Sequence, residues 1–412
     1  MSAELRRSLG VFDAVVIGLG AMVGAGIFVA LGPAAGAAGS GGGLLLALGI
    51  AAVVAYCNAM ASARLAAVHP SSGGTYVYGR ERLGPFWGYL AGWAFVVGKT
   101  ASCAAMALTV GAYVWPGQAH AVAVAAVVAL TAVNYGGVQK SALLTRVIVA
   151  LVLAVLAALV VVCLGAGWTS PLAPGGELTY GGVLQAAGLL FFAFAGYARI
   201  ATLGEEVRDP ARTIPRAVPV ALGIALAVYV LVAVSVLTVL GPGALADSPA
   251  PLTDAARAAG AAGLVPVVAV GAAVAALGSL LSLILGVSRT ALAMARDGYL
   301  PTALAAVHPR FQVPHRAELA VGAVVAAVAA TADVRGAIGF SSFGVLVYYG
   351  IANASAWTLG PERRALAALG LAGCGALAFA LPLGSVLAGS AVVAAGVVAW
   401  AVSRGRAEPP RP

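Results

Sequence analysis

The sequence predicts an all-α membrane protein with twelve transmembrane helices. Of its 412 residues, 62% are hydrophobic and 9% are charged, and the mean hydropathy is +1.01. Soluble domains carry about 25% charged residues, so this chain cannot cover itself with a water-facing surface. A window of about 19 residues finds twelve apolar runs, and a helix of about 17–25 residues crosses a bilayer core.

The predicted spans follow one another with short polar connections. The opening MSAELRRSLG is polar and basic, and the run after it is too long for a signal peptide, so the first span stays in the protein. The longest polar stretches, near 64–83, 241–264 and 295–316, are loops and not soluble domains. The expected spans lie near residues 11–35, 42–63, 84–114, 120–136, 144–165, 183–203, 216–240, 265–294, 317–332, 336–358, 365–381 and 384–402.

The basic residues predict the orientation. One set of alternate loops and termini holds only Arg257 and Arg335, while Lys99 and Arg199 lie inside spans. By the positive-inside rule, both termini are cytoplasmic in a multi-pass plasma-membrane protein. Topology thus explains the net charge of +9, without a nucleic-acid partner. The other set holds Arg6, Arg7, Arg64, Arg80, Arg82, Lys140, Arg146, Arg208, Arg212, Arg216, Arg289, Arg296, Arg310, Arg316, Arg363, Arg364, Arg404, Arg406 and Arg411.

Residues that could support enzyme chemistry are sparse. No HExxH motif occurs, and no span carries paired carboxylates, so we expect no metal, no cofactor and no enzyme activity. A channel would need a ring of charges or carbonyls from several similar segments. The two dissimilar interrupted spans described below suit a single closed site better than a pore. The four histidines lie in loops or at span ends: His69, His120, His308 and His315. The four cysteines lie in apolar runs without a CxxC spacing and are expected to pack: Cys57, Cys103, Cys163 and Cys374.

Two spans are weakened by glycine near their middle. The first contains IGLGAMVGAGIF at residues 17–28, with four glycines in nine residues. Each costs about 1 kcal/mol relative to alanine inside a helix. The sixth reads LLFFAFAGYARIATLGEE, with Gly196 near the membrane centre. Close helix packing is the alternative explanation, and Gly20 with Gly24 fits a small-xxx-small face.

The two weak spans occupy corresponding positions. If spans one to five (about 11–165) and six to ten (about 183–358) are repeats, the first starts inside and the second outside. Interrupted spans at corresponding places of inverted repeats point to a transporter's binding site. We therefore expect one transmembrane transporter domain over residues 1–403, with extra spans in 365–402 and a cytoplasmic tail at 404–412. After span six, Asp209 before Pro210 predicts the start of a short cytoplasmic helix.

Four segments resemble the amino acid–polyamine–organocation superfamily, in particular permeases of the cationic amino acid transporter type. The resemblance covers about residues 10–360. It implies a leucine-transporter-like fold of five-plus-five inverted repeats with two extra C-terminal helices, and alternating access around a central amino acid site. The segments are GLGAMVGAGIFVALGPAAGAAG, HPSSGGTYVYGRERLGPFWGYLAGW, FAFAGYARIATLGEEVRDPARTIPRA and SRTALAMARDGYLPTALAAVHPRFQVPHRAE.

The resemblance also implies a substrate site at the two weak spans. Orphan N–H groups at a broken helix bind a carboxylate, and unpaired backbone is tolerated in a membrane only where it lines a cavity. Core packing is the alternative for the two aromatic residues. The implied assignment is the carboxylate on N–H groups of Gly24, Ala25 and Gly26, the ammonium on carbonyls of Met22, Phe194 and Ala195, and an aromatic wall or gate from Phe192 and Tyr197.

Two departures from the cationic amino acid branch argue against a preference for arginine or lysine. That branch has an acidic residue where this chain has Ala198. It also has a lysine in the fifth span, at the place where sodium sits in ion-coupled relatives, and the matching stretch VIVALVLAVLAALVV has none.

Four further side chains are candidates for coupling or structure. Lys99 is expected to place its ammonium at the cation position beside span one and to link proton movement to transport, with snorkelling to an interface as the alternative. Arg199 is expected to cap carbonyls freed in span six, with substrate-carboxylate contact as the lesser alternative. Ser279 and Ser282 could supply hydroxyls to an ion site, or bond their own helix.

The functional prediction is a secondary active transporter of amino acids, working as a symporter or an antiporter with possible proton coupling. The alternatives are an exchanger of polyamines or other organic amines with the same fold, and a membrane sensor that binds without transporting. The partners expected are a small amino acid and membrane lipid. The sequence does not specify the amino acid or the oligomeric state.

Overall fold

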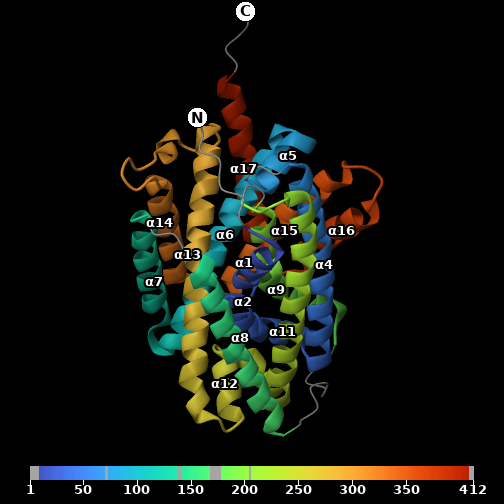
Figure 1. The fold of residues 1–412 in the computed structure, drawn as a ribbon, viewed down its shortest axis with the longest axis vertical. Coiled ribbons are helices and arrows are strands. Elements are labelled where there is room, and N and C mark those ends of the chain that lie inside the picture. The colour runs from blue at the N-terminus through green and yellow to red at the C-terminus, as the bar shows by residue number, and fades with distance from the viewer. Residues whose placement is uncertain (1–8, 70–72, 138–141, 168–177, 204–205, 408–412) are drawn as a thin grey trace, which may run out of the picture.

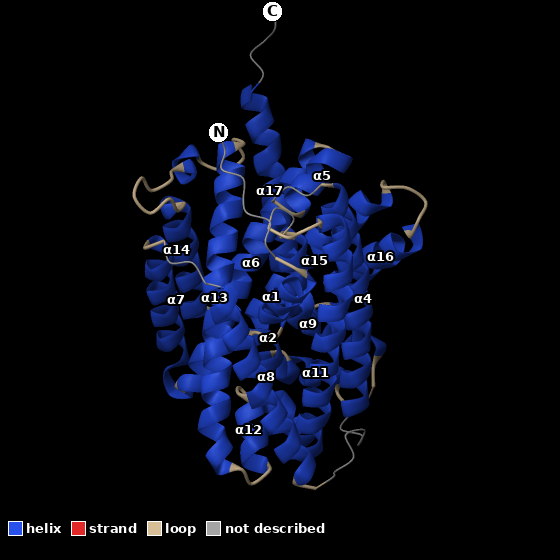
Figure 2. Ribbon diagram, viewed as in Figure 1, coloured by secondary structure: helices blue, strands red, loops and turns tan. Residues whose placement is uncertain are grey.

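The chain folds almost entirely into helices, as its apolar runs predict. The computed structural model describes residues 9–69, 73–137, 142–167, 178–203 and 206–407, and its regular elements there are α-helices and short 3₁₀ turns. Figure 2 shows these helices joined by short loops. Within the described part, ten helical segments are long and apolar enough to cross a membrane.

Helices cover all twelve predicted segments. α14 and α16 have 17 residues each and are not among the ten, so the count of twelve crossings stays a prediction. The α-helices are α1 (Val11–Met22), α2 (Ala25–Val29), α3 (Leu31–Ala38), α4 (Gly41–Val68), α5 (Thr75–Leu83), α6 (Pro85–Val114), α7 (Ala119–Tyr135), α8 (Ala142–Gly165), α9 (Tyr180–Phe194), α10 (Ala198–Ala201), α11 (Pro210–Asp247), α12 (Pro251–Ala258), α13 (Val265–Arg296), α14 (His315–Thr331), α15 (Val334–Trp357), α16 (Arg364–Ala380) and α17 (Leu383–Ala407).

The first span is broken where its glycines predict. α1 ends at Met22, and α2 begins at Ala25. Between them Val23 (φ −78°, ψ 49°) and Gly24 (φ −103°, ψ −145°) leave helical geometry. The chain then returns to helix through α2 and α3, so two half-helices face each other across a short non-helical segment.

The sixth span tightens and does not unwind. α9 ends at Phe194, a 3₁₀ turn η2 covers Ala195–Tyr197, and α10 follows directly. Tighter 3₁₀ geometry inside a helix is a frequent mark of a functional hinge. The predicted interruption near Gly196 is therefore present as a local change of helix type.

The helix expected after span six starts at the predicted residue but is not short. α11 begins at Pro210 with Asp209 as its N-cap, although the Asp209 side chain makes no capping hydrogen bond. It runs through Pro215 and Pro219 as far as Leu240, where Gly241 (φ 71°, ψ 169°) interrupts it, and a second helical stretch then reaches Asp247. The expectation of a separate cytoplasmic helix was wrong, because an apolar face continues through these prolines and packs against α4.

The broken spans lie at the centre of the bundle (Figure 1). α1 packs against α11 and α8, while α9 packs against α4 and α3. α7 and α14 pack together on one flank. α12 lies at the end of the molecule opposite to α5 and to the end of α17 (Figure 1).

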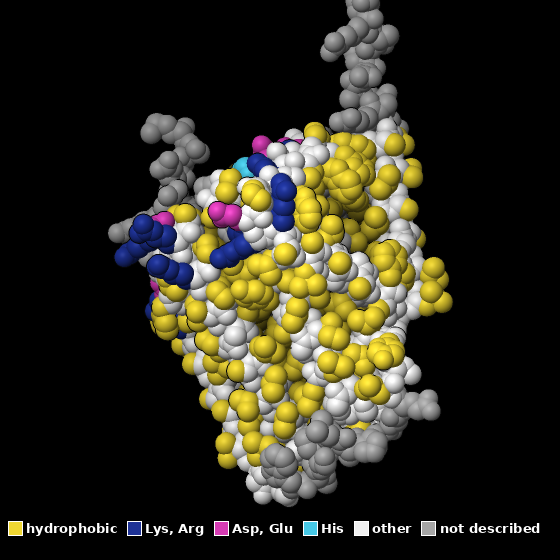
Figure 3. Space-filling view, turned by 90° about the vertical axis from the view of Figure 1, so that its right-hand side faces the viewer, with side chains coloured by type: hydrophobic (Ala, Val, Ile, Leu, Met, Phe, Trp, Pro, Cys, Tyr) yellow, Lys and Arg dark blue, Asp and Glu magenta, His cyan; other side chains and the backbone are white. Residues whose placement is uncertain are grey.

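One face of the molecule illustrates the charge distribution. In Figure 3 the blue Lys and Arg side chains gather toward the end from which the chain termini emerge, and the middle is mostly hydrophobic. An apolar belt bordered by basic residues on one side is typical of a protein that spans a membrane.

Candidate functional site

The two weak spans contact each other through their backbones. A Cβ on Gly196 would overlap the carbonyl of Ala21 and lie 2.7 Å from the Met22 nitrogen. A Cβ on Gly26 would lie 2.6 Å from the Cα of Ala193. Real Cβ contacts are not this short, so both glycines are required for the close approach. The glycines thus serve close packing of the two spans, at the same place where the substrate site is predicted.

A tyrosine on α11 joins the two spans. The Tyr229 hydroxyl lies 2.6 Å from the Met22 carbonyl oxygen and 2.9 Å from the Ala193 carbonyl oxygen, and its proton can be donated to either. Its ring packs edge-on against Phe194, with centroids 5.0 Å apart. Because unpaired carbonyls in a membrane interior are costly, one hydroxyl stabilises both spans at this point.

A lysine on α6 reaches the carbonyl in the sixth span. Lys99 Nζ donates to the Ala195 oxygen at 3.3 Å, and the Tyr349 hydroxyl donates to the same oxygen at 3.2 Å. Lys99 is 7% exposed, so it does not snorkel to an interface. The structure places its ammonium on the carbonyl assigned to the substrate ammonium, which differs from the expected cation position beside span one.

The predicted aromatic residues lie near these contacts. Tyr197 is fully buried, and its ring lies 4.9 Å from that of Tyr349. Phe192 is 7% exposed and belongs to the hydrophobic core around the breaks. Phe194 packs against Tyr229, as described above. Phe194 and Tyr197 thus lie beside the tyrosines that hold the carbonyls, whereas Phe192 is placed only in the core, and the role of the three as a wall around a substrate stays a prediction.

The two serines of the eighth span, now α13, differ in their surroundings. A Cβ on Gly24 would overlap Ser279 Oγ, so this hydroxyl faces the break in the first span. Ser279 Oγ is buried without a hydrogen-bond partner in the described part of the chain. Ser282 Oγ donates to the Gly278 carbonyl at 3.1 Å, within its own helix. Ser279 therefore remains a candidate for an ion site. Ser282 instead bonds its own helix, which was the alternative expectation for both serines.

Arg199 does not cap the carbonyls of the sixth span. Its side chain is exposed, and Nη1 donates to the Thr202 hydroxyl at 3.3 Å. The correction has a geometric reason: Arg199 lies in α10, two residues beyond η2, and its guanidinium reaches the Thr202 hydroxyl of the next turn and not the Ala195 carbonyl. The donors at Ala195 come from α6 and α15.

Three tyrosines were missed by sequence reasoning. Tyr229 and Tyr349 hold the carbonyls described above, and Tyr113 on α6 donates to the Phe28 carbonyl at 2.6 Å. A tyrosine in an apolar span could have indicated a buried hydrogen bond, because a buried phenol usually finds a partner. The sequence does not indicate which carbonyl the hydroxyl reaches, since that depends on the rotation of the helix.

Both ends of the central region are tied by hydrogen bonds. On one side, the backbone of Leu9 pairs with the segment after α10. The Leu9 N–H donates to the backbone carbonyl of Glu206 at 3.1 Å, and the backbone N–H of Arg208 donates to the Leu9 carbonyl at 2.9 Å. At the other end, the Leu252 nitrogen of α12 donates to the Tyr113 hydroxyl at 3.3 Å. Hydrogen bonds thus link the first span's surroundings to neighbouring segments on both sides of the central contacts.

The Tyr229 hydroxyl gives a first testable prediction. Tyr229→Phe keeps the ring against Phe194 and removes the donor for two buried carbonyls. An unsatisfied buried group costs about 1–3 kcal/mol, so we expect a lower thermal unfolding temperature in detergent. The control is Tyr180→Phe, because Tyr180 is 93% exposed. An unfolding temperature equal to that of the control would mean that Tyr229 does not hold the two spans.

Comparison with known proteins identifies transporters. The model of the amino acid permease family matches residues 9–407. An uncharacterized transporter of Mycobacterium tuberculosis is 73% identical over 407 residues, which are 97% of this chain and 92% of that protein.

Two more distant relatives have a cargo in their names. The branched-chain amino acid permease of Bacillus subtilis is 26% identical, with 76% of this chain and 72% of that protein covered. Human cationic amino acid transporter 4 is 30% identical, with 85% of this chain and 59% of that protein covered. Their amino acids differ in charge, so the comparisons identify transport without fixing one side chain.

Proposed function

The chain belongs to the amino acid permease family, and from this premise we propose that it is a secondary active transporter of amino acids. It would work by alternating access between the two sides of the plasma membrane. The fold proposed for it is the five-plus-five inverted repeat with two extra helices. The proposal is supported most directly by one observation: the broken first span and the tightened sixth span touch at the centre of the bundle.

The substrate carboxylate is proposed to bind at the start of α2. The chain leaves helical geometry at Val23 and Gly24, so the N–H groups of Gly24, Ala25 and Gly26 lie at the beginning of a half-helix. Such groups lack partners within the helix and carry a partial positive charge. Since Gly26 packs on Ala193 in this structure, substrate entry requires the two spans to separate there.

The substrate ammonium is proposed to bind at the Ala195 carbonyl, with the Phe194 carbonyl next to it in the chain and the Met22 carbonyl on the first span, which packs against Gly196. Lys99 Nζ already donates to the Ala195 oxygen. Two ammonium groups repel each other in a low-dielectric site, so a charged substrate and a charged Lys99 exclude each other. Substrate binding would therefore release the proton of Lys99, which favours exchange of substrate against protons over symport.

The same cation argues against polyamines as cargo. A polyamine carries several positive charges, and the release of one proton from Lys99 compensates for only one of them. An amino acid brings a carboxylate as well, which compensates for the charge. The observation that favours an amino acid over a polyamine is therefore the position of the Lys99 ammonium at the tightened turn.

Uptake decides between a carrier and a sensor. A thermal-shift screen of amino acids and polyamines should find a ligand, because binding to the folded state raises stability in proportion to RT ln(1 + [L]/Kd). The labelled ligand should then accumulate in proteoliposomes that contain the protein. Binding without accumulation or exchange would indicate the sensor, and a response to polyamines alone would contradict the proposed cargo.

The proposed orientation gives a second testable prediction. Thr302 and Ala262 are exposed and lie in loops on opposite sides of the membrane if both termini are cytoplasmic. The native cysteines are buried, so they leave a low background for a membrane-impermeant thiol reagent. In intact cells, Ala262→Cys should be labelled and Thr302→Cys should not. Reversed labelling would overturn the orientation.

A further inference from the structure

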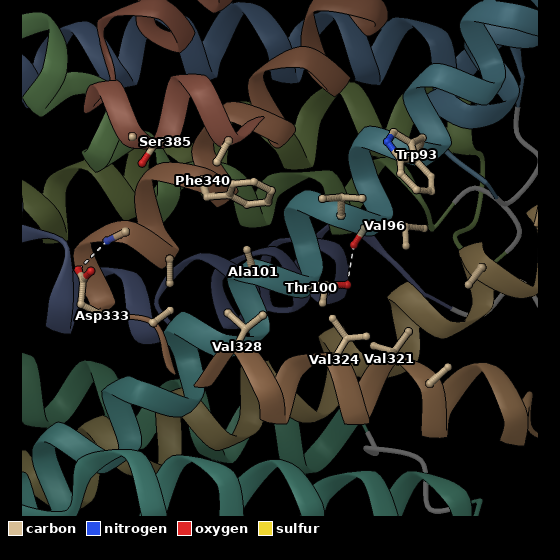
Figure 4. A pocket seen from close by; sticks show the side chains of 18 of the residues that line it. Trp93, Val96, Thr100, Ala101, Val321, Val324, Val328, Asp333, Phe340 and Ser385 are labelled. Atoms are coloured by element: carbon tan, nitrogen blue, oxygen red, sulfur yellow. Dashed lines mark hydrogen bonds between the residues drawn. The ribbon is translucent and has the colours of Figure 1, made fainter. Parts of the chain in front are cut away.

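A large apolar cavity lies away from the broken spans. It has a volume of about 800 Å³ and is lined by residues of α6, α14, α15 and α17 (Figure 4). In Figure 4, Val321, Val324 and Val328 project from α14 toward α6, while Phe340 and Ser385 lie across from them. The wall is made mainly of aliphatic and aromatic side chains.

Helix α6 separates this cavity from the proposed substrate site. Thr100 lines the cavity, whereas the preceding residue, Lys99, donates to Ala195 on the other side of the helix. Thr100 Oγ1 donates to the Val96 carbonyl at 2.7 Å, so its hydroxyl is satisfied within α6. The cavity therefore offers hydrophobic contact along most of its length, and an amino acid zwitterion would find few partners in it.

One end of the cavity is charged. Asp333 and Arg335, at the junction of α14 and α15, both line the cavity and are exposed. Asp333 Oδ1 accepts from the Gly336 nitrogen at 2.8 Å, and this contact caps α15. No hydrogen bond or ion pair among the described residues uses the other Asp333 oxygen or the Arg335 guanidinium. A cation and an anion thus stand two residues apart at the mouth of an apolar slot.

We propose that this cavity binds a phospholipid with an amine headgroup, such as phosphatidylethanolamine. An acyl chain fills the apolar slot, the lipid phosphate accepts from Arg335, and its ammonium donates to Asp333. Guanidinium groups match phosphate geometry, and charge-assisted hydrogen bonds are stronger than neutral ones. The site lies in the leaflet opposite the chain termini and is independent of the transported substrate.

The charges of Asp333 and Arg335 favour this lipid over a second protein copy as the occupant of the cavity. An apolar helix from another copy could fill the slot, but it would leave Asp333 and Arg335 exposed and would gain nothing from them. The zwitterionic headgroup satisfies both residues and also fits the membrane location of the slot.

Native mass spectrometry of the full-length protein from mixed lipid nanodiscs tests the proposal. With equal amounts of phosphatidylethanolamine, phosphatidylcholine and phosphatidylglycerol, we expect one retained phosphatidylethanolamine. The trimethylated headgroup cannot donate a hydrogen bond to Asp333, and phosphatidylglycerol has no ammonium. Arg335→Gln should lower this retention about tenfold, as expected for the loss of one charge-assisted hydrogen bond. Asp333→Asn keeps an oxygen for the α15 cap and should reduce the preference for the amine headgroup.

Two further variants make the result specific. Arg257→Gln is the matched control, because Arg257 pairs with Asp254 at 2.5 Å and does not line the cavity. It should retain the lipid as the unchanged protein does. Val324→Trp should exclude the acyl chain. Equal retention of the three lipids, or the same loss for Arg257→Gln and Arg335→Gln, would overturn the proposal. A lipid-free dimer that Val324→Trp dissociates would assign the cavity to a second copy.

Discussion

Lys99→Met is expected to remove the pH dependence of substrate binding and uptake. If the substrate ammonium takes the Ala195 carbonyl as proposed, it competes there with the Lys99 ammonium, so each binding event releases a proton. Affinity then rises with pH, by up to about tenfold per pH unit where one proton is released. Methionine carries no proton, so binding should stay strong and nearly constant. The Tyr349 hydroxyl still covers Ala195 in this variant.

Lys99→Arg is the matched opposite of this change. Arginine stays protonated throughout the accessible pH range, so we expect weak binding at every pH. Isothermal titration in two buffers of different ionisation enthalpy measures the released protons directly. Uptake in proteoliposomes between pH 5.5 and 8 gives the transport profile, and replacing sodium with choline should change nothing.

Other ionisable groups beside Lys99 need their own variants. Cys103 lies one turn along α6, and Tyr349 shares the Ala195 carbonyl. Cys103→Ser and Tyr349→Phe should keep the pH dependence. A sodium requirement, or an unchanged pH profile in Lys99→Met, would remove Lys99 from the coupling mechanism while leaving the family membership intact.

The positions of the helices were predictable because hydropathy depends on local sequence alone. An apolar run must satisfy its own backbone in a membrane, and a helix does so without reference to the rest of the chain. The break at Gly24 was predictable for the same reason, since glycine weakens a helix wherever it stands. The start of α11 at Pro210 also follows from local geometry.

The partners of the buried polar groups were not predictable, because they depend on helix rotation and depth. Lys99 and Ala195 are 96 positions apart in the chain, and Tyr229 and Met22 are 207 apart. Nothing in either local sequence specifies which face of α6 or α11 meets the broken spans. Arg199 shows the same limit: its charge suggested a partner at the turn, whereas the rotation of α10 leaves it exposed.

Gly26→Leu is expected to reduce folded protein strongly, and not only to block the substrate. Its Cβ would lie 2.6 Å from the Cα and 2.8 Å from the Cβ of Ala193. Backbone atoms cannot move aside as the end of a flexible side chain can, so α2 and α9 must separate. Overpacking a tight contact costs about 1–3 kcal/mol or more. Gly26→Ala should show the same effect to a smaller degree.

Gly223→Leu isolates this effect from the general cost of a larger residue in a membrane helix. Gly223 lies in α11, and a Cβ there meets nothing within 4 Å, so the variant should keep the unfolding temperature of the unchanged protein. Fluorescence-detected size-exclusion chromatography and thermal unfolding would compare the three variants, with binding normalised to folded protein. If Gly26→Leu folds normally and only binding is lost, then Gly26 faces an open substrate path in the prevailing state. If folding and binding fall together, as we expect, the glycine is there because two spans must touch before either can present its backbone to a substrate.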